Sequence, residues 1–200
     1  KAGVAEIVAA AEYLIAHPEI AHGAIRIAFT PDEEIGRGTE HFDVRTFGAA
    51  CAYTMDAAGR GQLEMETFSA DALVVTFQGF NTHPGLAKGR MINSIKVAAD
   101  FIGRLPRDAR SPETTEGREG FFHPYMMSAS VEQTSVRFLI RDFVTAELRA
   151  KEAFLESLAR ATVAAWPGAS VTFKVEESYR NMKEVLDRHP QVVEHAREAI

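Results

Sequence analysis

The chain has 200 residues, enough for one large domain or two small ones, and its composition, 46% hydrophobic and 25% charged, is typical of a soluble globular protein. The net charge of −6, from 22 basic and 28 acidic residues, argues against non-specific binding to nucleic acids or anionic membranes and is compatible with cation binding. Cys51 is the only cysteine, which excludes an intrachain disulfide and a thiolate zinc cluster, and no apolar run approaches the length of a membrane span.

The first part of the chain predicts helices that alternate with short strands. "AIRIAFT" (24–30) and "AACAYTM" (49–55) are apolar runs typical of buried strands, and a weak helix or turn is expected between them at 39–47. This alternation favours part of a parallel α/β sheet, in which ligands collect at the carboxyl ends of the strands. An amphipathic helix is expected before them, over residues 2–16, because one helical face gathers Val4, Ile7, Val8, Ala11, Leu14 and Ile15.

The stretch "FTPDEEIGRG" crowds three acids between a proline and two glycines, at the end of the first predicted strand. Neighbouring side chains on an extended segment point in opposite directions, so we expect Glu33 and Glu34 to have different roles: one binds a cation and the other faces its water. Asp56, after the second predicted strand, is a candidate for a further ligand. An exposed acidic turn is the alternative, and three carboxylates without a nearby histidine would by themselves favour magnesium over zinc.

The middle of the chain predicts a β-α-β-β-α-β order from Phe68 to about Glu177, which is the ferredoxin-like arrangement. Thr145 is expected to cap the second helix. A helical segment follows, which would return the chain to the first domain. The expected strands are 68–79, 121–131, 134–143 and 167–178, and the expected helices are 90–105 and 145–166.

Several motifs together resemble the peptidase T family, the cytoplasmic aminotripeptidases of the two-zinc aminoacylase/carboxypeptidase superfamily. They are "FTPDEEIGRG", "YTMDAAGRGQLEMETF", "FNTHPGLAKGRMIN", "SPETTEGREGF", "IRDF" and "ESYRNM", in this order. "PDEE" alone would indicate only the superfamily, whereas its combination with "THPG", "TEGREGF" and "IRDF" indicates the peptidase T branch. The resemblance covers essentially the whole chain.

The resemblance implies an α/β fold with three segments. Residues 1–66 would be part of a zinc-exopeptidase-type α/β catalytic domain, and residues 67–177 would form an inserted ferredoxin-like lid and dimerisation domain. Residues 178–200 would return to the catalytic domain. Helical patterns are interrupted at both ends of the sequence, so we expect the chain to be the middle of a longer protein.

The resemblance also implies roles for three acids. Glu33 matches the general base, which takes a proton from the attacking water and passes it to the departing amine. Glu34 matches a ligand of one zinc ion, and Asp56 matches a ligand of the other.

Three further residues match the family's substrate-binding groups. His83 resembles the histidine that reaches the active site of the partner subunit and stabilises the oxyanion. Arg141 resembles the arginine that holds a substrate carboxylate, and Asn93 is expected to contact substrate. Without the resemblance, His83 is more simply a turn histidine, and Arg141 one half of a surface ion pair with Asp142.

The chain departs from the family pattern in its metal ligands. No H-x-D motif precedes Phe29, and the family's bridging aspartate and late histidine are not found. The intact family member would hold two Zn²⁺ ions, whereas the site in this chain would be incomplete. We therefore expect the chain alone to have little peptidase activity and weak zinc affinity.

The leading hypothesis is thus the central part of a cytoplasmic, homodimeric zinc aminotripeptidase that removes the N-terminal residue from small peptides. It would have no nucleic-acid or membrane partner. The alternatives are another exopeptidase or a deacylase of the same superfamily, and a non-catalytic dimerisation or binding module.

Overall fold

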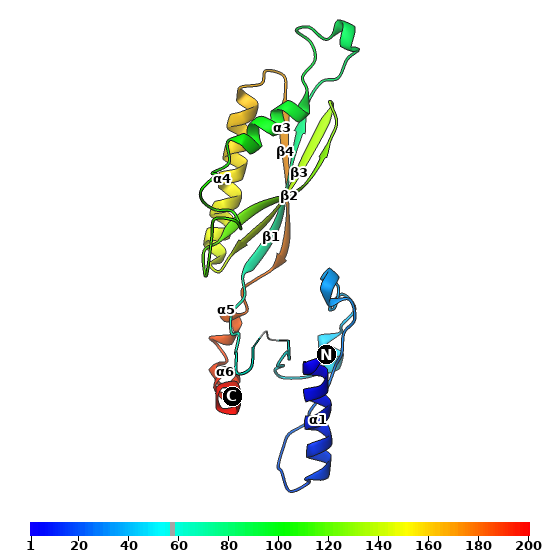
Figure 1. The fold of residues 1–200 in the computed structure, drawn as a ribbon, viewed down its shortest axis with the longest axis vertical. Coiled ribbons are helices and arrows are strands. Elements are labelled where there is room, and N and C mark those ends of the chain that lie inside the picture. Colours follow the sequence, from blue (N-terminus) through cyan, green and yellow to red (C-terminus); the bar gives the residue numbers. More distant parts are fainter. Residues whose placement is uncertain (57–58) are drawn as a thin grey trace. The chain divides into compact units, whose positions relative to one another are not determined.

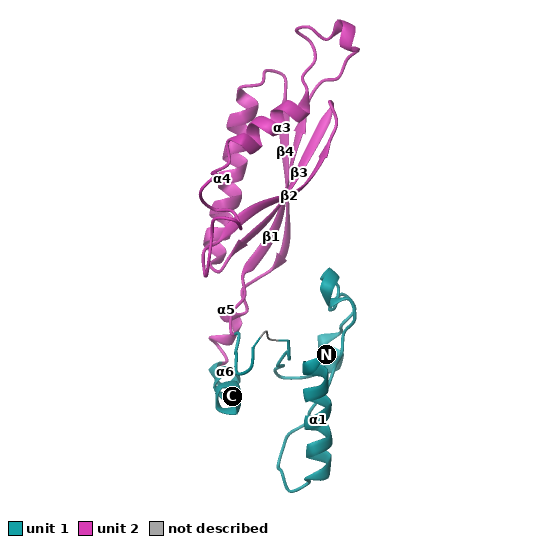
Figure 2. Ribbon diagram, in the orientation of Figure 1, with its two compact units in different colours: residues 1–64, 190–200 teal, residues 65–189 magenta. Residues whose placement is uncertain are grey.

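The computed structural model describes residues 1–56 and 59–200, which form two compact units. Unit 1 comprises residues 1–64 and 190–200, and unit 2 comprises residues 65–189 (Figure 2). The three-segment division expected from the sequence stays a prediction.

Unit 2 is a four-stranded antiparallel sheet with two helices on one face (Figure 1). The strand order is β2-β3-β1-β4, and α3 and α4 connect strands across the same face. This confirms the predicted ferredoxin-like arrangement. The elements are β1 (Ser69–Gln78), η2 (Pro84–Leu86), α3 (Ser94–Gly103), β2 (Phe121–Ala129), β3 (Gln133–Asp142), α4 (Thr145–Ala164), β4 (Ser170–Tyr179) and α5 (Lys183–Leu186).

The core of unit 2 lies between the helices and one face of the sheet, here called the helix face. Alternate residues of the central strands β1 and β3 point into it, as the period of two requires, and the opposite, open face is only partly buried. Each large apolar side chain that is fully buried here stabilises the fold by about 1.5–3 kcal/mol. The largest are Leu73, Phe77, Phe101, Phe122, Phe138, Ile140, Leu148 and Leu155.

The start of α4 differs from the expectation. Val144 occupies the N-cap position without a side-chain cap, and Thr145 is the first helical residue. The Thr145 hydroxyl instead donates to Glu184 at 2.9 Å and lies 3.0 Å from the Ser69 hydroxyl. The prediction of Thr145 as N-cap was therefore wrong, because these long-range partners occupy the hydroxyl.

Unit 1 contains short helices joined by extended segments. The helix at 2–16 and the turn and helix near 44–47 are confirmed, but the strands predicted at 24–30 and 49–55 are wrong. A strand forms only beside a neighbour that pairs with its backbone, and within the described residues of unit 1 neither run has one. The elements are α1 (Ala2–Ala16), η1 (Glu33–Ile35), α2 (Val44–Phe47) and α6 (Pro190–Ala199).

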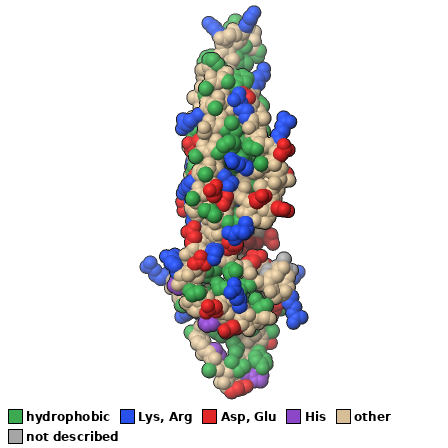
Figure 3. Space-filling view, turned by 90° about the vertical axis from the view of Figure 1, so that its left-hand side faces the viewer, with side chains coloured by type: hydrophobic (Ala, Val, Ile, Leu, Met, Phe, Trp, Pro, Cys, Tyr) green, Lys and Arg blue, Asp and Glu red, His purple; other side chains and the backbone are tan. Residues whose placement is uncertain are grey.

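The surface of the chain carries charges of both signs. Lysine and arginine side chains alternate with aspartate and glutamate over the face in Figure 3, rather than gathering in one large patch. Among the described residues, no helix is both long and apolar enough to cross a bilayer.

A buried pair of acids joins the sheet to α4. Asp71 of β1 is fully buried and Glu152 of α4 is 6% exposed. The Arg180 guanidinium forms an ion pair with the Asp71 carboxylate at 2.8 Å, and the Arg149 guanidinium lies 3.1 Å from the Glu152 carboxylate. Burial, together with the hydrogen bond to Asp71, raises the pKa of Glu152 from its ordinary value of 4.5 to about 7. Glu152 thus keeps its proton in the folded protein at mildly acidic pH.

This pair predicts a pH-dependent stability. The folded state binds the Glu152 proton more tightly than the unfolded state does, so its contribution to stability is complete below pH 4.5 and is lost as the pH rises through about 7. The loss is on the order of 3 kcal/mol at most. In Glu152→Gln, which mimics the protonated acid, this part of the pH dependence should vanish. Urea unfolding of both proteins at pH 5 and pH 8 measures it, and the same pH dependence in both would contradict the assignment.

Candidate functional site

The acidic stretch forms a tight turn that ends in a single turn of 3₁₀ helix, η1. Asp32 precedes it in the left-handed conformation with φ 61°, and Gly36 ends it with φ 69°. The Arg37 amide donates to the Asp32 carbonyl at 3.0 Å and closes the turn. Glu33 and Glu34 are therefore helical, not extended as expected. Successive side chains of a 3₁₀ helix are about 120° apart, so the two carboxylates still point in different directions.

Asp56 follows a segment that contacts two helices of unit 1. Gly3 of α1 lies so close to Met55 that a Cβ atom there would clash with the Met55 carbonyl oxygen. The Tyr53 hydroxyl donates to the Val192 carbonyl of α6 at 2.8 Å. These contacts fix the chain immediately before Asp56. The next two residues in sequence lie outside the described residues.

The three predicted metal-site acids are exposed. In residues 1–56 and 59–200, no group of three or more His, Cys, Asp and Glu side chains is placed to hold a metal ion. As placed in the structure, these described residues therefore do not by themselves fit a two-metal centre. A shared site for Glu33, Glu34 and Asp56 stays a prediction.

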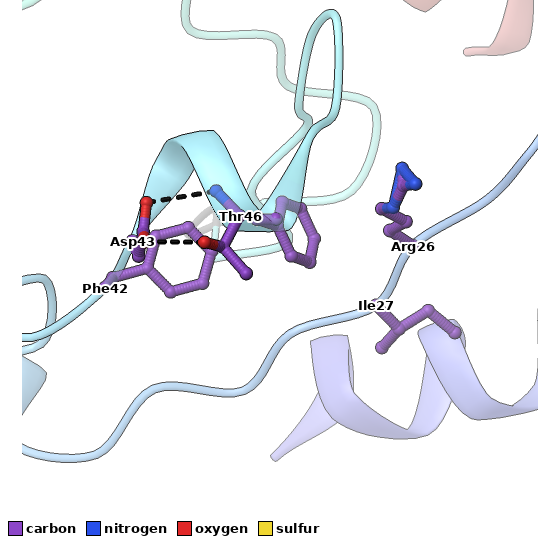
Figure 4. A pocket seen from close by; sticks show the side chains of 6 residues that line it. Arg26, Ile27, Phe42, Asp43 and Thr46 are labelled. Atoms are coloured by element: carbon purple, nitrogen blue, oxygen red, sulfur yellow. Dashed lines mark hydrogen bonds between the residues drawn. The ribbon is translucent and has the colours of Figure 1, made fainter.

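A pocket of about 530 Å³ in unit 1 does not contain the predicted site residues (Figure 4). Its one acid, Asp43, caps α2 by accepting hydrogen bonds from the Thr46 hydroxyl at 2.6 Å and the Thr46 amide at 3.0 Å. These bonds lower the pKa of Asp43 and occupy both carboxylate oxygens. The pocket is lined by Arg26, Ile27, Phe42, Asp43, Thr46 and Phe47.

His83 lies in the loop after β1, at the N-cap of η2. Its Nδ1 atom accepts a hydrogen bond from the Gly85 amide at 3.1 Å. This bond assigns the proton of the neutral ring to Nε2, which leaves an exposed N–H group able to donate to an anion. The turn-histidine interpretation and the donor role are thus compatible, because they use different ring nitrogens.

Asn93 is the N-cap of α3. Its side-chain oxygen accepts a hydrogen bond from the Ile95 amide at 2.9 Å. A contact with substrate would therefore use the amide Nδ2 group. Asparagine directly before a helical pattern is a capping signal that can be recognised in the sequence.

Arg141 lies on β3, on the open face of the sheet. The expected alternative, an ion pair with Asp142, is wrong, because Asp142 points to the other face and pairs with Lys151. The Arg141 guanidinium instead lies over the Tyr179 ring, 5.5 Å from its centroid. The residues next to Arg141 in the sequence give no sign of Tyr179, because a contact across an intervening strand leaves no local pattern.

The sheet holds His83 and Arg141 far apart within one chain. Arg141 pairs with Ala70 near the start of β1, whereas His83 follows Gln78 at the end of that strand. Eight residues of strand at about 3.3 Å each separate the two ends by about 26 Å. Within one unit 2, Arg141 therefore lies near the start of β1 and His83 lies beyond its end.

Comparison with known sequences identifies both a family and close relatives. Residues 65–167, just over half of the chain, match the peptidase dimerisation domain family. Peptidase T of Exiguobacterium sibiricum is 48% identical over all 200 residues, which are 48% of its own length. Peptidase T of Geobacillus kaustophilus is 46% identical over the same share of each chain. The chain thus spans about half the length of the curated relatives that it matches.

Solved structures with the same fold include two peptidases. Aminopeptidase PepT from Bacillus cereus superposes with a TM-score of 0.72 at 20% identity, covering 96% of this chain and 54% of that one. A tripeptidase from Staphylococcus aureus gives a TM-score of 0.67 at 19% identity, covering 84% and 45%. At these identities the likeness concerns the fold alone.

Proposed function

Since the chain belongs to the peptidase dimerisation domain family, we propose that it supplies the lid and part of the active site of a dimeric metallo-aminopeptidase that cleaves tripeptides. The observation that carries this proposal is the 48% identity to a peptidase T over every residue of the chain, unit 1 included. We place the activity in the cytoplasm. The substrate would be a small peptide, with no nucleic-acid or membrane partner.

The roles that we propose for the acids rest on their match to the motifs of the peptidase T family. Glu33 is the general base: its exposed carboxylate would take the proton of the attacking water and deliver it to the leaving amine. Glu34, the next residue on η1, and Asp56 would each bind one of two zinc ions. The other ligands expected for the family are not in this sequence, so the 200 residues alone should have little activity.

The lid residues would act on the substrate itself. Arg141 offers a planar cation on the open face for a peptide carboxylate. His83 offers its Nε2–H group to the developing oxyanion, and Asn93 its amide group to the peptide. Because Arg141 lies near the start of β1 and His83 lies beyond its end, with about 26 Å of strand between Ala70 and Gln78, we propose that each site takes these two residues from different subunits of a homodimer.

A second candidate is a non-catalytic dimerisation module. It is favoured by the match of the family to residues 65–167, which form most of unit 2. A further alternative is another exopeptidase or a deacylase of the same superfamily, which would differ in the products that it releases.

These candidates are distinguished with a chimaera, in which the 200 residues replace the matching residues of the Exiguobacterium sibiricum peptidase T. We expect the chimaera to release leucine and the dipeptide Ala-Gly from Leu-Ala-Gly, whose three different residues identify the bond that is cleaved, while the 200-residue chain alone shows no turnover. Mass spectrometry of the products provides the measurement. Release of the C-terminal residue, or removal of an N-acetyl group from acetylated trialanine, would indicate a different member of the superfamily. A folded, dimeric chimaera without any turnover would favour the module.

A further inference from the structure

Three residues form a row across the open face of the sheet. Ala70 of β1 lies opposite Arg141 of β3 on one side and opposite Tyr179 of β4 on the other. The Arg141 guanidinium carbon is 5.5 Å from the centroid of the Tyr179 ring. Because β1 lies between the two strands, the arginine side chain reaches its aromatic partner by passing over Ala70.

The small side chain of Ala70 makes this contact possible. Ala70 is fully buried although it belongs to the open face, where the next residue on that face, Ala72, is only half-buried. A larger side chain at this position would fill the space that the arginine crosses.

A β-bulge turns Tyr179 toward Arg141. Asp71 pairs with Glu177 and Ala70 pairs with Tyr179, so Ser178 is an extra residue in β4. In regular pairing Ala70 would face Ser178, and Tyr179 would point to the helix face. Bulges are known to redirect side chains in this way beside functional sites.

Hydrogen bonds from Arg180 to β1 stabilise the bulge. Its guanidinium donates to the Ala70 carbonyl at 3.1 Å and to Asp71 at 2.8 Å. In addition, the Asn181 amide donates to the Ser69 hydroxyl at 3.0 Å. The end of β4 is thereby held against the start of β1, and Tyr179 with it.

We infer that Tyr179 is a positioning residue, which holds the Arg141 guanidinium on the open face in the orientation that binds the carboxylate of a short peptide. The inference rests on the proposed role of Arg141. In the described part of the chain, no ion pair joins Arg141 to a carboxylate, and the one hydrogen bond of its guanidinium goes to the Ile140 carbonyl. A guanidinium stacked on an aromatic face keeps N–H groups at its edge for a planar anion.

The contact itself can be tested in the 200-residue chain by NMR. The Arg141 Hε resonance, assigned through its loss in Arg141→Lys, should be shifted upfield by the ring current of Tyr179. The shift should persist in Tyr179→Phe, which keeps the ring, and disappear in Tyr179→Leu. Tyr13→Leu, which removes a tyrosine of α1, serves as the matched control and should leave it unchanged. An Hε resonance without an upfield shift in the unaltered chain would overturn the inference without any variant.

The effect of the contact on substrate binding can be tested in the chimaera by steady-state kinetics. Tyr179→Leu should raise KM for trialanine about 3- to 10-fold with kcat unchanged, because it weakens ground-state and transition-state binding alike. Tyr179→Phe should keep the wild-type KM, because it retains the ring. Ala70→Leu should raise KM as Tyr179→Leu does. If Arg141→Ala raises KM but Tyr179→Leu does not, the positioning role is wrong and the proposed function stands. If Arg141→Ala itself leaves KM unchanged, the proposed anchoring role of Arg141 fails.

Discussion

Glu33→Gln should reduce the kcat of the chimaera by about 10²–10⁴-fold, the usual contribution of a positioned general base. Glutamine has the size of glutamate but cannot accept the proton of the attacking water. Glu33 lies on η1, exposed at the surface of unit 1, so the exchange leaves no buried group without a partner. Hydrolysis of trialanine, followed by chromatography of the released alanine, measures the loss.

Two controls accompany this variant. Glu12→Gln, an equivalent change on the exposed surface of α1, should leave kcat unchanged. Light scattering should show that Glu33→Gln remains dimeric, because the residues that match the dimerisation domain family all lie in unit 2. If Glu33→Gln keeps more than a tenth of the wild-type kcat, Glu33 is not the base.

A mixed dimer should recover the activity that two single variants lose. His83→Ala is expected to cost about 10²–10³-fold in kcat, as the loss of one oxyanion donor does in other enzymes. Arg141→Ala is expected to raise KM, because it removes the cation that holds the substrate carboxylate. In a dimer with one variant of each kind, one site has both residues intact and the other site has neither.

The activity that the mixed dimer should recover can be calculated. Random pairing of the two variants makes about half of the dimers mixed, each with one intact site of two. At trialanine concentrations well below the wild-type KM, where both parent variants are impaired, the specific activity should therefore be about a quarter of the wild-type value. Coexpression with two affinity tags isolates the mixed dimer, in which the value should be about one half. Activity no higher than that of either parent variant would mean that both residues of one subunit serve the same site, although they lie toward opposite ends of β1.

Most of unit 2 could be predicted from sequence because its core is self-contained. Leu73 and Phe77 of β1 follow the period of two, and Val97 and Phe101 of α3 follow the helical period, and all four are buried within the same unit. Local pattern and final packing therefore agree.

Unit 1 shows where this reasoning fails. The alternation of Ile25, Ile27 and Phe29 fits a strand, but these side chains are 57%, 44% and 55% exposed and the backbone has no pairing neighbour. The extended backbone assumed for Glu33 also failed, because Asp32 adopts a positive φ that an aspartate tolerates but no hydrophobic pattern reveals.

For the candidate site, the sequence indicates the residue types but not how they are placed together. The residue types of Glu33, Glu34 and Asp56 indicate metal chemistry, yet their joint placement depends on contacts between segments distant in sequence. The contact of Arg141 with Tyr179 depends on a bulge at Ser178 and on the small size of Ala70. Neither feature leaves a signal in the residues next to Arg141.

If the acids of unit 1 belong to one two-metal site, as we propose, the metal content of the protein should depend on each of them. The chimaera, purified and dialysed against metal-free buffer, should contain about two zinc ions per protomer by inductively coupled plasma mass spectrometry. Glu34→Ala and Asp56→Ala should each retain about one, because each removes a ligand of a different ion. Two zinc ions in both variants would mean that neither acid is a ligand, and the proposed two-metal site would be wrong.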